Sequence, residues 1–169
     1  GLPGAVANVQ PMPEAATRKP MSDVSQSIEA GSLSVEFDFD YARKVIEAEA
    51  KAIASVTPIV DASFGQACRM IYECTGSCIV SGIGKAGIIG RKFSATLAST
   101  GTPSHFLHPA EAVHGDLGRL RKNDVVIVLS YGGETDEVTR LINLVKQLDI
   151  KLIAITGEPD STLCKYSDV

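Results

Sequence analysis

The sequence lacks the features that mark several broad classes of protein. None of its apolar runs approaches the roughly 20 residues that a membrane-spanning helix needs, and no continuous apolar segment near its start is typical of a secretory signal. Its formal net charge of −4 lacks the basic excess that is usual in general nucleic-acid binders. We therefore expect a cytoplasmic protein that binds neither membrane nor nucleic acid.

Cysteine is also scarce. Four cysteines in 169 residues do not form the dense framework of a disulfide-rich domain. Cys74 and Cys78 have a spacing that a metal site could use, but no partner pair follows them. Thiols packed in a core are therefore the preferred interpretation.

The beginning of the chain differs from the rest. Residues 1–35 are rich in Gly, Ala and Pro and show no helical or strand period, which predicts a flexible tail. Residues 36–169 have a regular pattern and are numerous enough for one domain with a core. Apolar residues at helical spacing predict helices over 42–56, 60–71, 87–100, 134–149 and, more briefly, 161–168. Short apolar runs predict strands at 77–82, 104–108, 124–130 and 151–156.

This order of elements predicts an α/β fold with a parallel sheet covered on both sides. The stretch between the second and third predicted strands is interpreted as a loop. Right-handed crossovers leave few topologies, and the flavodoxin-like strand order 2-1-3-4 is preferred. In that order the first and third strands are neighbours at the switch point, where ligands bind at the carboxyl ends of the strands.

The two loops predicted at that point have unusual compositions. "GIGKAG" (82–87) combines three glycines with Lys85 just before the next predicted helix, and glycines such as Gly84 allow positive φ and close backbone approach. Free N–H groups at a helix start bind anions, and a lysine adds a mobile positive charge. "SYGGET" (130–135) offers the hydroxyls of Ser130 and Thr135, and Gly133 allows close backbone approach. We expect the pair of loops to bind a phosphorylated sugar.

Other phosphate-binding motifs fit less well. The glycine spacing of the first loop is neither the dinucleotide fingerprint nor a Walker A loop. Glu134 and Glu137 lie in a predicted first helical turn, where acidic residues often only complement the helix dipole. All three histidines of the chain lie within ten residues. His105 is interpreted as structural, whereas the other two are interpreted as site residues.

Four segments together carry a family resemblance: "GIGKAG", "ATLASTGTPSHFLHPAEAVHGDLG", "LSYGGETDE" and "IAITGEPDSTL". From about residue 37 to 169 the chain resembles the sugar isomerase (SIS) domain of the arabinose 5-phosphate isomerase family. The resemblance implies a three-layer SIS sandwich around a five-stranded parallel sheet. It also implies interconversion of D-ribulose 5-phosphate and D-arabinose 5-phosphate, the first step toward the lipopolysaccharide sugar Kdo. Relatives are typically homotetramers that require no cofactor, and many carry CBS repeats after this domain.

The resemblance also implies roles for individual residues. The catalytic lysine falls on Lys85 and a catalytic glutamate on Glu137, and substrate contacts fall on Gly101, Thr102, His108 and His114. The position of His114 is also where an inhibitory divalent metal can bind in relatives. The chain departs from the family at Ala86 and Gly132, where a serine is common.

The end of the chain departs from the family as well. It stops where the fifth strand is expected, so the domain is predicted to be incomplete at its C-terminus. The family's phosphate loop, its second catalytic glutamate and its catalytic histidine would follow that point. Two alternatives remain open: a non-catalytic sugar-phosphate sensor, and an isomerase of a related phosphosugar.

Overall fold

The computed structural model describes residues 38–169, so the tail expected over residues 1–35 lies outside the described part. The chain divides after Asp61 into two compact units. In the first unit, helix α1 (Phe39–Ala54) begins at Asp38, whose carboxylate accepts a 2.8 Å hydrogen bond from the Tyr41 N–H. A short 3-10 helix, η2 (Thr57–Ile59), contains the proline that was predicted to end this helix.

The second unit alternates helices and strands, as the sequence predicts. Its helices are α2 (Ala62–Tyr72), α3 (Gly84–Ser99), α4 (Pro109–His114), η3 (Asp116–Arg119), α5 (Asp136–Gln147) and α6 (Thr162–Tyr166). Its strands are β1 (Cys78–Gly82), β2 (Ser104–Phe106), β3 (Val125–Leu129) and β4 (Lys151–Ile155). No helix among residues 38–169 is long and apolar enough to cross a membrane.

The four strands form one parallel sheet in the order β2-β1-β3-β4. This confirms the predicted order 2-1-3-4. Strands β1 and β3 pair along their full lengths, from Cys78 with Val125 to Gly82 with Leu129. Every residue of these two central strands is buried, which explains why their sequences show no polar alternation.

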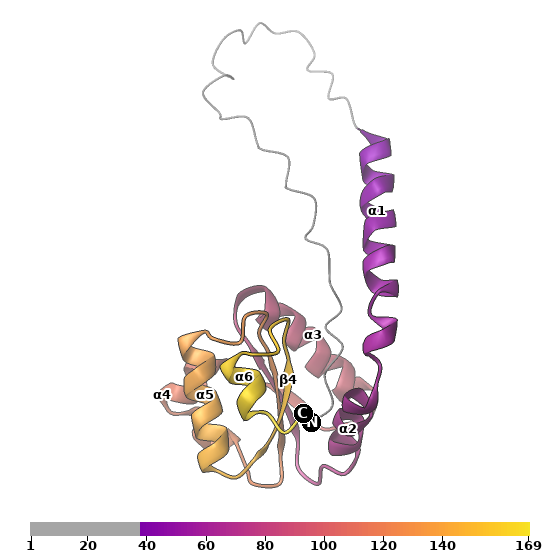
Figure 1. The fold of residues 1–169 in the computed structure, drawn as a ribbon. Helices are drawn as coiled ribbons and strands as arrows, with labels where there is room; N and C mark the ends of the chain where they lie inside the picture. The colour runs from indigo at the N-terminus through magenta and orange to yellow at the C-terminus, as the bar shows by residue number, and fades with distance from the viewer. Residues whose placement is uncertain (1–37) are drawn as a thin grey trace, which may run out of the picture. The chain divides into compact units, whose positions relative to one another are not determined.

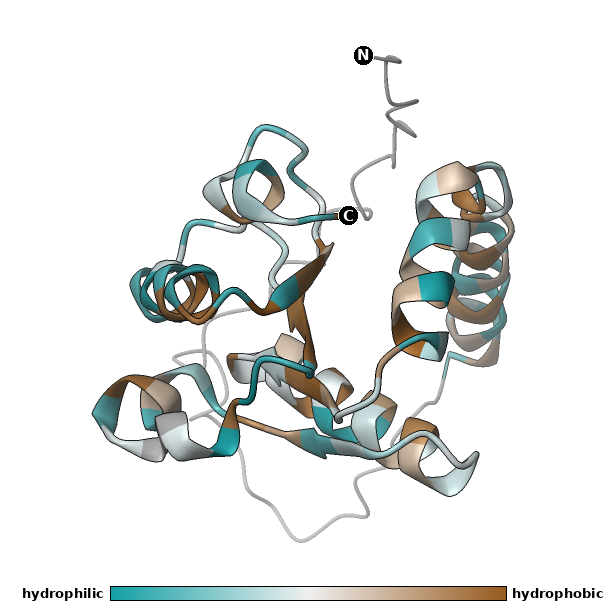
Figure 2. Cartoon of the chain, turned by 90° about the horizontal axis from the view of Figure 1, so that it is seen from below, coloured by the Kyte–Doolittle hydropathy of each residue, from teal (hydrophilic) through white to brown (hydrophobic). Residues whose placement is uncertain are grey.

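Helices cover both faces of the sheet, which confirms the three-layer architecture (Figure 1). On one face, Val126, Val128 and Leu152 pack with the apolar stripe of α5 and with residues of α4 and α6. On the other face, Val80 and Ile127 pack with residues of α2 and α3. Figure 2 shows the apolar strands between the helices of the two outer layers.

The stretch interpreted as a loop between β2 and β3 contains two short helices instead, so that prediction was wrong. Helix α4 begins at His108, whose Nδ1 accepts a 3.2 Å hydrogen bond from the Ala110 N–H, and Pro109 occupies the first turn. A proline fits there because its ring fixes φ near the helical value and no N–H is needed. A His-Pro start is a weaker sequence signal than the usual Ser, Thr, Asp or Asn cap.

The last two residues lie along the outer edge of β4. The Asp168 N–H donates to the Leu152 carbonyl at 2.8 Å, and the Ala154 N–H donates to Val169 at 2.8 Å. The Asp168 carboxylate also accepts a hydrogen bond from the Leu152 N–H at 2.9 Å and contacts Lys146 and Lys151. These bonds pair backbone groups at the outer edge of β4 with the last two residues of the same chain.

Candidate functional site

The carboxyl ends of β1 and β3 meet at the centre of one edge of the sheet, which is called the carboxyl edge below. Gly82 and Leu129, the last residues of the two strands, are paired. Neighbouring strands lie about 4.8 Å apart, so the loops that follow begin side by side. From there the chain leaves in opposite directions, because α3 packs on one face and α5 on the other. This is the predicted switch point.

The first loop turns from β1 directly into α3. Ile83 is extended at the N-cap position and makes no side-chain capping bond, and Gly84 has a φ of +58°, which is strained for any residue with a side chain. The N–H of Gly87 bonds to the Ile83 carbonyl at 3.3 Å, so the three N–H groups before it precede the first helical hydrogen bond. Lys85 is exposed and has no hydrogen bond or ion pair within residues 38–169. The turn therefore presents N–H groups and one cation.

The second loop is folded around Ser130 and Gly133. The buried Ser130 hydroxyl accepts a 3.1 Å hydrogen bond from the Gly133 N–H. Gly133 has a φ of +64°, and a Cβ there would lie 2.4 Å from the Ser161 Oγ. Glycine is therefore needed at this position for both conformation and space.

A third loop, residues 156–161, holds the second loop in place together with Thr162, the first residue of α6. The Gly157 N–H and the Thr156 hydroxyl both donate to the Tyr131 carbonyl at 3.0 Å. The Glu134 carboxylate accepts hydrogen bonds from the Thr162 N–H and, at 2.8 Å, from the Thr162 hydroxyl. These hydrogen bonds lower the pKa of Glu134, the bond from the Thr162 N–H most strongly. In the sequence this loop was noted only as part of the family resemblance, and its role in holding the site was not predicted.

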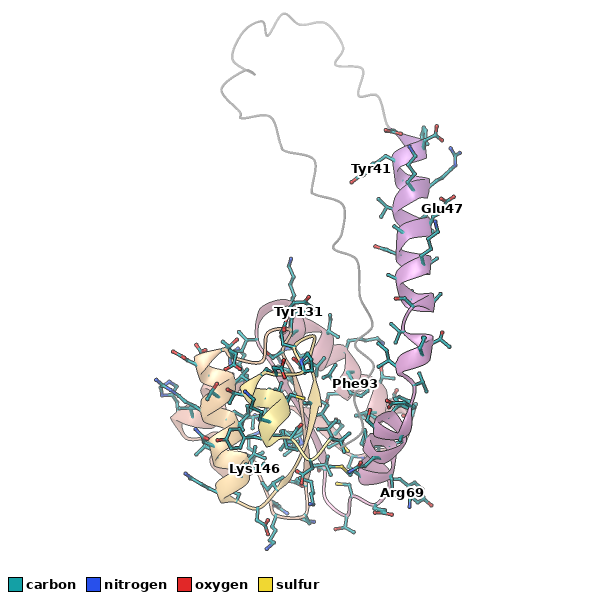
Figure 3. The ribbon with its side chains drawn as sticks, viewed as in Figure 1. Tyr41, Glu47, Arg69, Phe93, Tyr131 and Lys146 are labelled. Carbon is teal, nitrogen blue, oxygen red and sulfur yellow. The ribbon has the colours of Figure 1, made fainter. Side chains whose placement is uncertain are left out.

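Two predicted site residues lie where α5 begins. Thr135 is the N-cap residue, and its side chain makes no capping bond. Glu137 is exposed in the first turn, on the opposite face of the sheet from Lys85. In Figure 3, Tyr131 lies at this edge of the sheet, and Lys146 marks the far end of α5. Glu137 and Lys85 therefore flank the same edge from two sides.

The two predicted histidines occupy the two ends of α4. His108 comes just after β2, the neighbour of β1, which places it at the carboxyl edge. Because its Nδ1 accepts the capping hydrogen bond, the proton of the neutral ring lies on Nε2, which can donate to a ligand. His114 is exposed at the last position of α4.

Gly101 and Thr102 lie elsewhere. They follow α3 and precede β2, at the amino edge of the sheet, and the adjacent Pro103 carbonyl accepts a 2.8 Å hydrogen bond from the N–H of Cys78, the first residue of β1. They line a hollow of about 230 Å³ together with Cys74 and Cys78. The structure does not bring these two predicted contacts to the loops of the same chain.

Metal-ligating residues do not converge in the described part. Among residues 38–169, no group of three or more His, Cys, Asp or Glu side chains could hold an ion. Cys78 is buried and Cys74 packs against the same apolar cluster, which agrees with the interpretation of the cysteines as core thiols, but Cys68 is exposed and does not fit it. A metal at His114 stays a prediction.

Comparisons with known proteins identify the fold family. The SIS domain profile matches residues 70–169. The chain belongs to the SIS domain family. This SIS domain is 47% identical over 134 residues to the arabinose 5-phosphate isomerase KdsD of Shigella flexneri. It is 45% identical over 139 residues to KdsD of Pseudomonas aeruginosa. These alignments cover 79% and 82% of the chain, but only 41% and 43% of the two enzymes, so it spans less than half of their length.

This chain covers a greater share of the similar solved structures than of the two KdsD enzymes. A candidate sugar-phosphate isomerase from Listeria monocytogenes superposes with a TM-score of 0.75 at 33% identity, covering 79% of this chain and 73% of that one. An Escherichia coli CFT073 protein in complex with A5P superposes with a TM-score of 0.69 at 36% identity, over 79% and 73% of the two chains. The SIS architecture expected from the sequence is thereby confirmed.

Proposed function

We propose that this SIS domain interconverts D-ribulose 5-phosphate and D-arabinose 5-phosphate. The observation that carries the proposal is the pairing of Gly82 with Leu129, which joins the lysine loop and the hydroxyl loop at one edge. KdsD relatives with about 47% identity and a structural neighbour in complex with A5P support the choice of substrate. A cation at the start of α3 and a carboxylate at the start of α5 support catalysis rather than binding alone.

The phosphate would bind where N–H groups and hydroxyls meet. The N–H groups that open α3 precede the first helical hydrogen bond, and Gly84 has open space beside it, because a Cβ added there would meet nothing within 4 Å. Ser130 accepts a hydrogen bond from Gly133 and keeps its own proton to donate to an anion. Thr135 adds a second hydroxyl. Backbone and hydroxyl donors of this kind bind phosphate oxygens without needing a fixed charge.

The reaction moves one proton between C1 and C2 of the sugar through an enediolate. In the proposed mechanism the Glu137 carboxylate removes the proton from one carbon and returns it to the other. Lys85 stabilises the negative oxygen of the enediolate or holds the phosphate, and both roles need its positive charge. His108, through its Nε2–H, donates to a substrate hydroxyl. Since aldose and ketose are isomers, the proposed reaction includes no cofactor.

We further propose that the working form is a homo-oligomer, and specifically a tetramer. Helix α3 carries two exposed apolar side chains, Ile88 with 70% and Ile89 with 60% of its surface accessible. Tyr72 at the end of α2 is 91% exposed. Contact between copies would bury these side chains. A neighbouring copy would also bring its own Gly101 and Thr102 to a site that they do not reach within one chain.

Proton NMR of D-ribulose 5-phosphate in D₂O tests the proposal. With the chain added, the C1 proton signal should decrease as solvent deuterium exchanges, and the anomeric signal of D-arabinose 5-phosphate should grow. Lys85→Ala and Glu137→Gln should abolish both changes. Two matched controls, Lys92→Ala on the same helix and Asp136→Asn beside Glu137, should retain them.

The outcomes separate catalysis from binding. Turnover that persists in Lys85→Ala and Glu137→Gln would contradict the roles proposed for these two residues. A second outcome is that no turnover occurs but the phosphorus signal of the sugar phosphate broadens when the chain is added. If Lys85→Ala abolishes this broadening, the result would favour a binding domain over an isomerase.

A further inference from the structure

A polar hollow in the second unit lies at the opposite end of the sheet from the loops. It has a volume of about 650 Å³ and is lined mainly by polar residues at the amino ends of β1, β2 and β3. Seven residues with side chains line it: Thr75, Ser77, His105, Arg119, Arg121, Asn123 and Asp124. None of them is part of the carboxyl edge, and the proposed isomerase chemistry uses none of them.

Asp124 builds the floor of this hollow. Its side chain is 5% exposed, and its two carboxylate oxygens accept hydrogen bonds from the Ser77 N–H at 2.8 Å and the Arg121 N–H at 2.7 Å. Through these two bonds the carboxylate connects the backbone just before β1 with the backbone just before β3. The carboxylate thus holds the shape of the hollow, and each of its oxygens already has a donor.

The remaining polar groups face outward from this floor. The Arg121 guanidinium is exposed and makes no ion pair or hydrogen bond within residues 38–169. Arg119 donates from Nη2 to the Phe106 carbonyl at 3.3 Å, which holds its guanidinium at the rim. Arg121 therefore contributes a positive charge to the lining that no described side chain neutralises.

His105 lines the hollow and carries a polar atom without a partner. Its Nε2 is buried and has no hydrogen-bond partner among the described residues. Burial, followed by the Arg119 charge, lowers the pKa of His105, so the ring is neutral at neutral pH. A buried polar atom without a partner costs free energy, and a bound group that fills its hydrogen bond recovers it. The sequence interpretation of His105 as merely structural leaves this atom unexplained.

We propose that this hollow is a second ligand site, which binds a small phosphorylated anion with its phosphate between Arg121 and His105. Guanidinium groups recognise phosphate through charge-assisted hydrogen bonds, and the hydroxyls of Thr75 and Ser77 extend the polar lining. A volume of this size exceeds that of the phosphate alone, which leaves room for an organic part of the ligand. The site is distinct from the carboxyl edge because the full length of β1 and β3 separates them.

A titration with inorganic phosphate, followed by amide chemical shifts of the full chain, tests the proposal. A titration with chloride at the same ionic strength is the control for general charge screening. Phosphate should shift the amides of Gly76, Ser77 and Asn123 at the amino edge, separately from those of the loop after β1. Arg121→Ala should weaken the amino-edge response about tenfold, as expected for a charge-assisted hydrogen bond.

Three further variants test alternative explanations of the result. Lys122→Ala removes the neighbouring charge, which pairs with Asp149 at 2.9 Å and does not line the hollow, so its amino-edge response should match the wild type. His105→Phe keeps the ring and removes Nε2, and it should also weaken the response. Lys85→Ala should abolish the carboxyl-edge shifts alone, which separates this proposal from the proposed isomerase site.

Three results would overturn the second site. One is a phosphate response confined to the carboxyl edge. Another is an equal loss in Arg121→Ala and Lys122→Ala, which would show general charge screening. The third is an unchanged amino-edge response in both Arg121→Ala and His105→Phe.

Discussion

Gly82 and Leu129 are paired at the last position of β1 and β3, and this pairing joins two loops that lie far apart in the sequence. The sheet order puts the two strands side by side, and the opposite directions of α3 and α5 open the edge between them. The proposed chemistry depends on this relationship, because neither loop alone offers a cation, hydroxyls and a carboxylate.

Gly133→Ala should destabilise the fold and disrupt the second loop. Its φ of +64° disfavours a side chain, and the new Cβ would lie 2.4 Å from the Ser161 Oγ. Left-handed strain and overpacking together predict a loss of about 2 kcal/mol or more in the free energy of unfolding. Urea denaturation followed by far-UV circular dichroism would measure it.

Gly132→Ala is the matched control for that substitution. A Cβ at Gly132 meets nothing within 4 Å, and its φ is not in the left-handed region. We expect a change within about 0.5 kcal/mol. Equal unfolding midpoints for the two variants would contradict the close packing of the second loop against the loop that holds it.

Glu134→Gln should reveal a pH-dependent contribution to stability. The pKa of Glu134 is lowered in the folded state, first by the hydrogen bond from the Thr162 N–H, so folding favours the ionised carboxylate. This contribution is fully present above the unfolded pKa and is lost as the pH falls through the lowered folded pKa. The wild type should therefore exceed the variant in thermal midpoint at neutral pH, and the difference should shrink in acid. A difference that grows on acidification would show the opposite sign of linkage.

The sequence predicted the sheet and the carboxyl edge well because those features follow from local patterns. Continuous apolar runs at β1 and β3 and the glycines at their ends carry the information directly. The helix start at His108 was missed because a histidine cap has a weak signature. The bond between Glu134 and Thr162 joins residues 28 apart, and no local pattern predicts such a contact.

Two placements needed the three-dimensional structure for another reason. Gly101 and Thr102 belong to a motif that the resemblance assigns to the substrate, yet the strand direction puts them at the amino edge. The polar hollow around Arg121 and His105 depends on turns from three strands that meet only after the sheet forms. Periodicity and motif spacing contain no signal for either arrangement.

The four cysteines should differ in reactivity. Burial, and next the neighbouring Cys74, raise the pKa of Cys78 to about 12, so almost no thiolate forms at pH near 8. Cys68 is exposed. Alkylation of the native chain followed by peptide mass spectrometry should therefore label Cys68 first and Cys78 last.

Unfolding provides the control for the alkylation experiment. In concentrated urea all four cysteines should react at similar rates, since burial no longer suppresses the thiolate. Early labelling of Cys78 in the native chain would contradict the packed amino end of β1.

The central claim is that Lys85 and the paired loops bind a sugar phosphate, and calorimetric titration with D-arabinose 5-phosphate tests it most directly. The account predicts that Lys85→Ala weakens binding about tenfold or more, because a charge-assisted contact to the substrate is lost. Lys92→Ala, which removes an exposed charge farther along α3, should leave the affinity within about twofold of the wild type. Equal affinities for the wild type and Lys85→Ala would contradict the account.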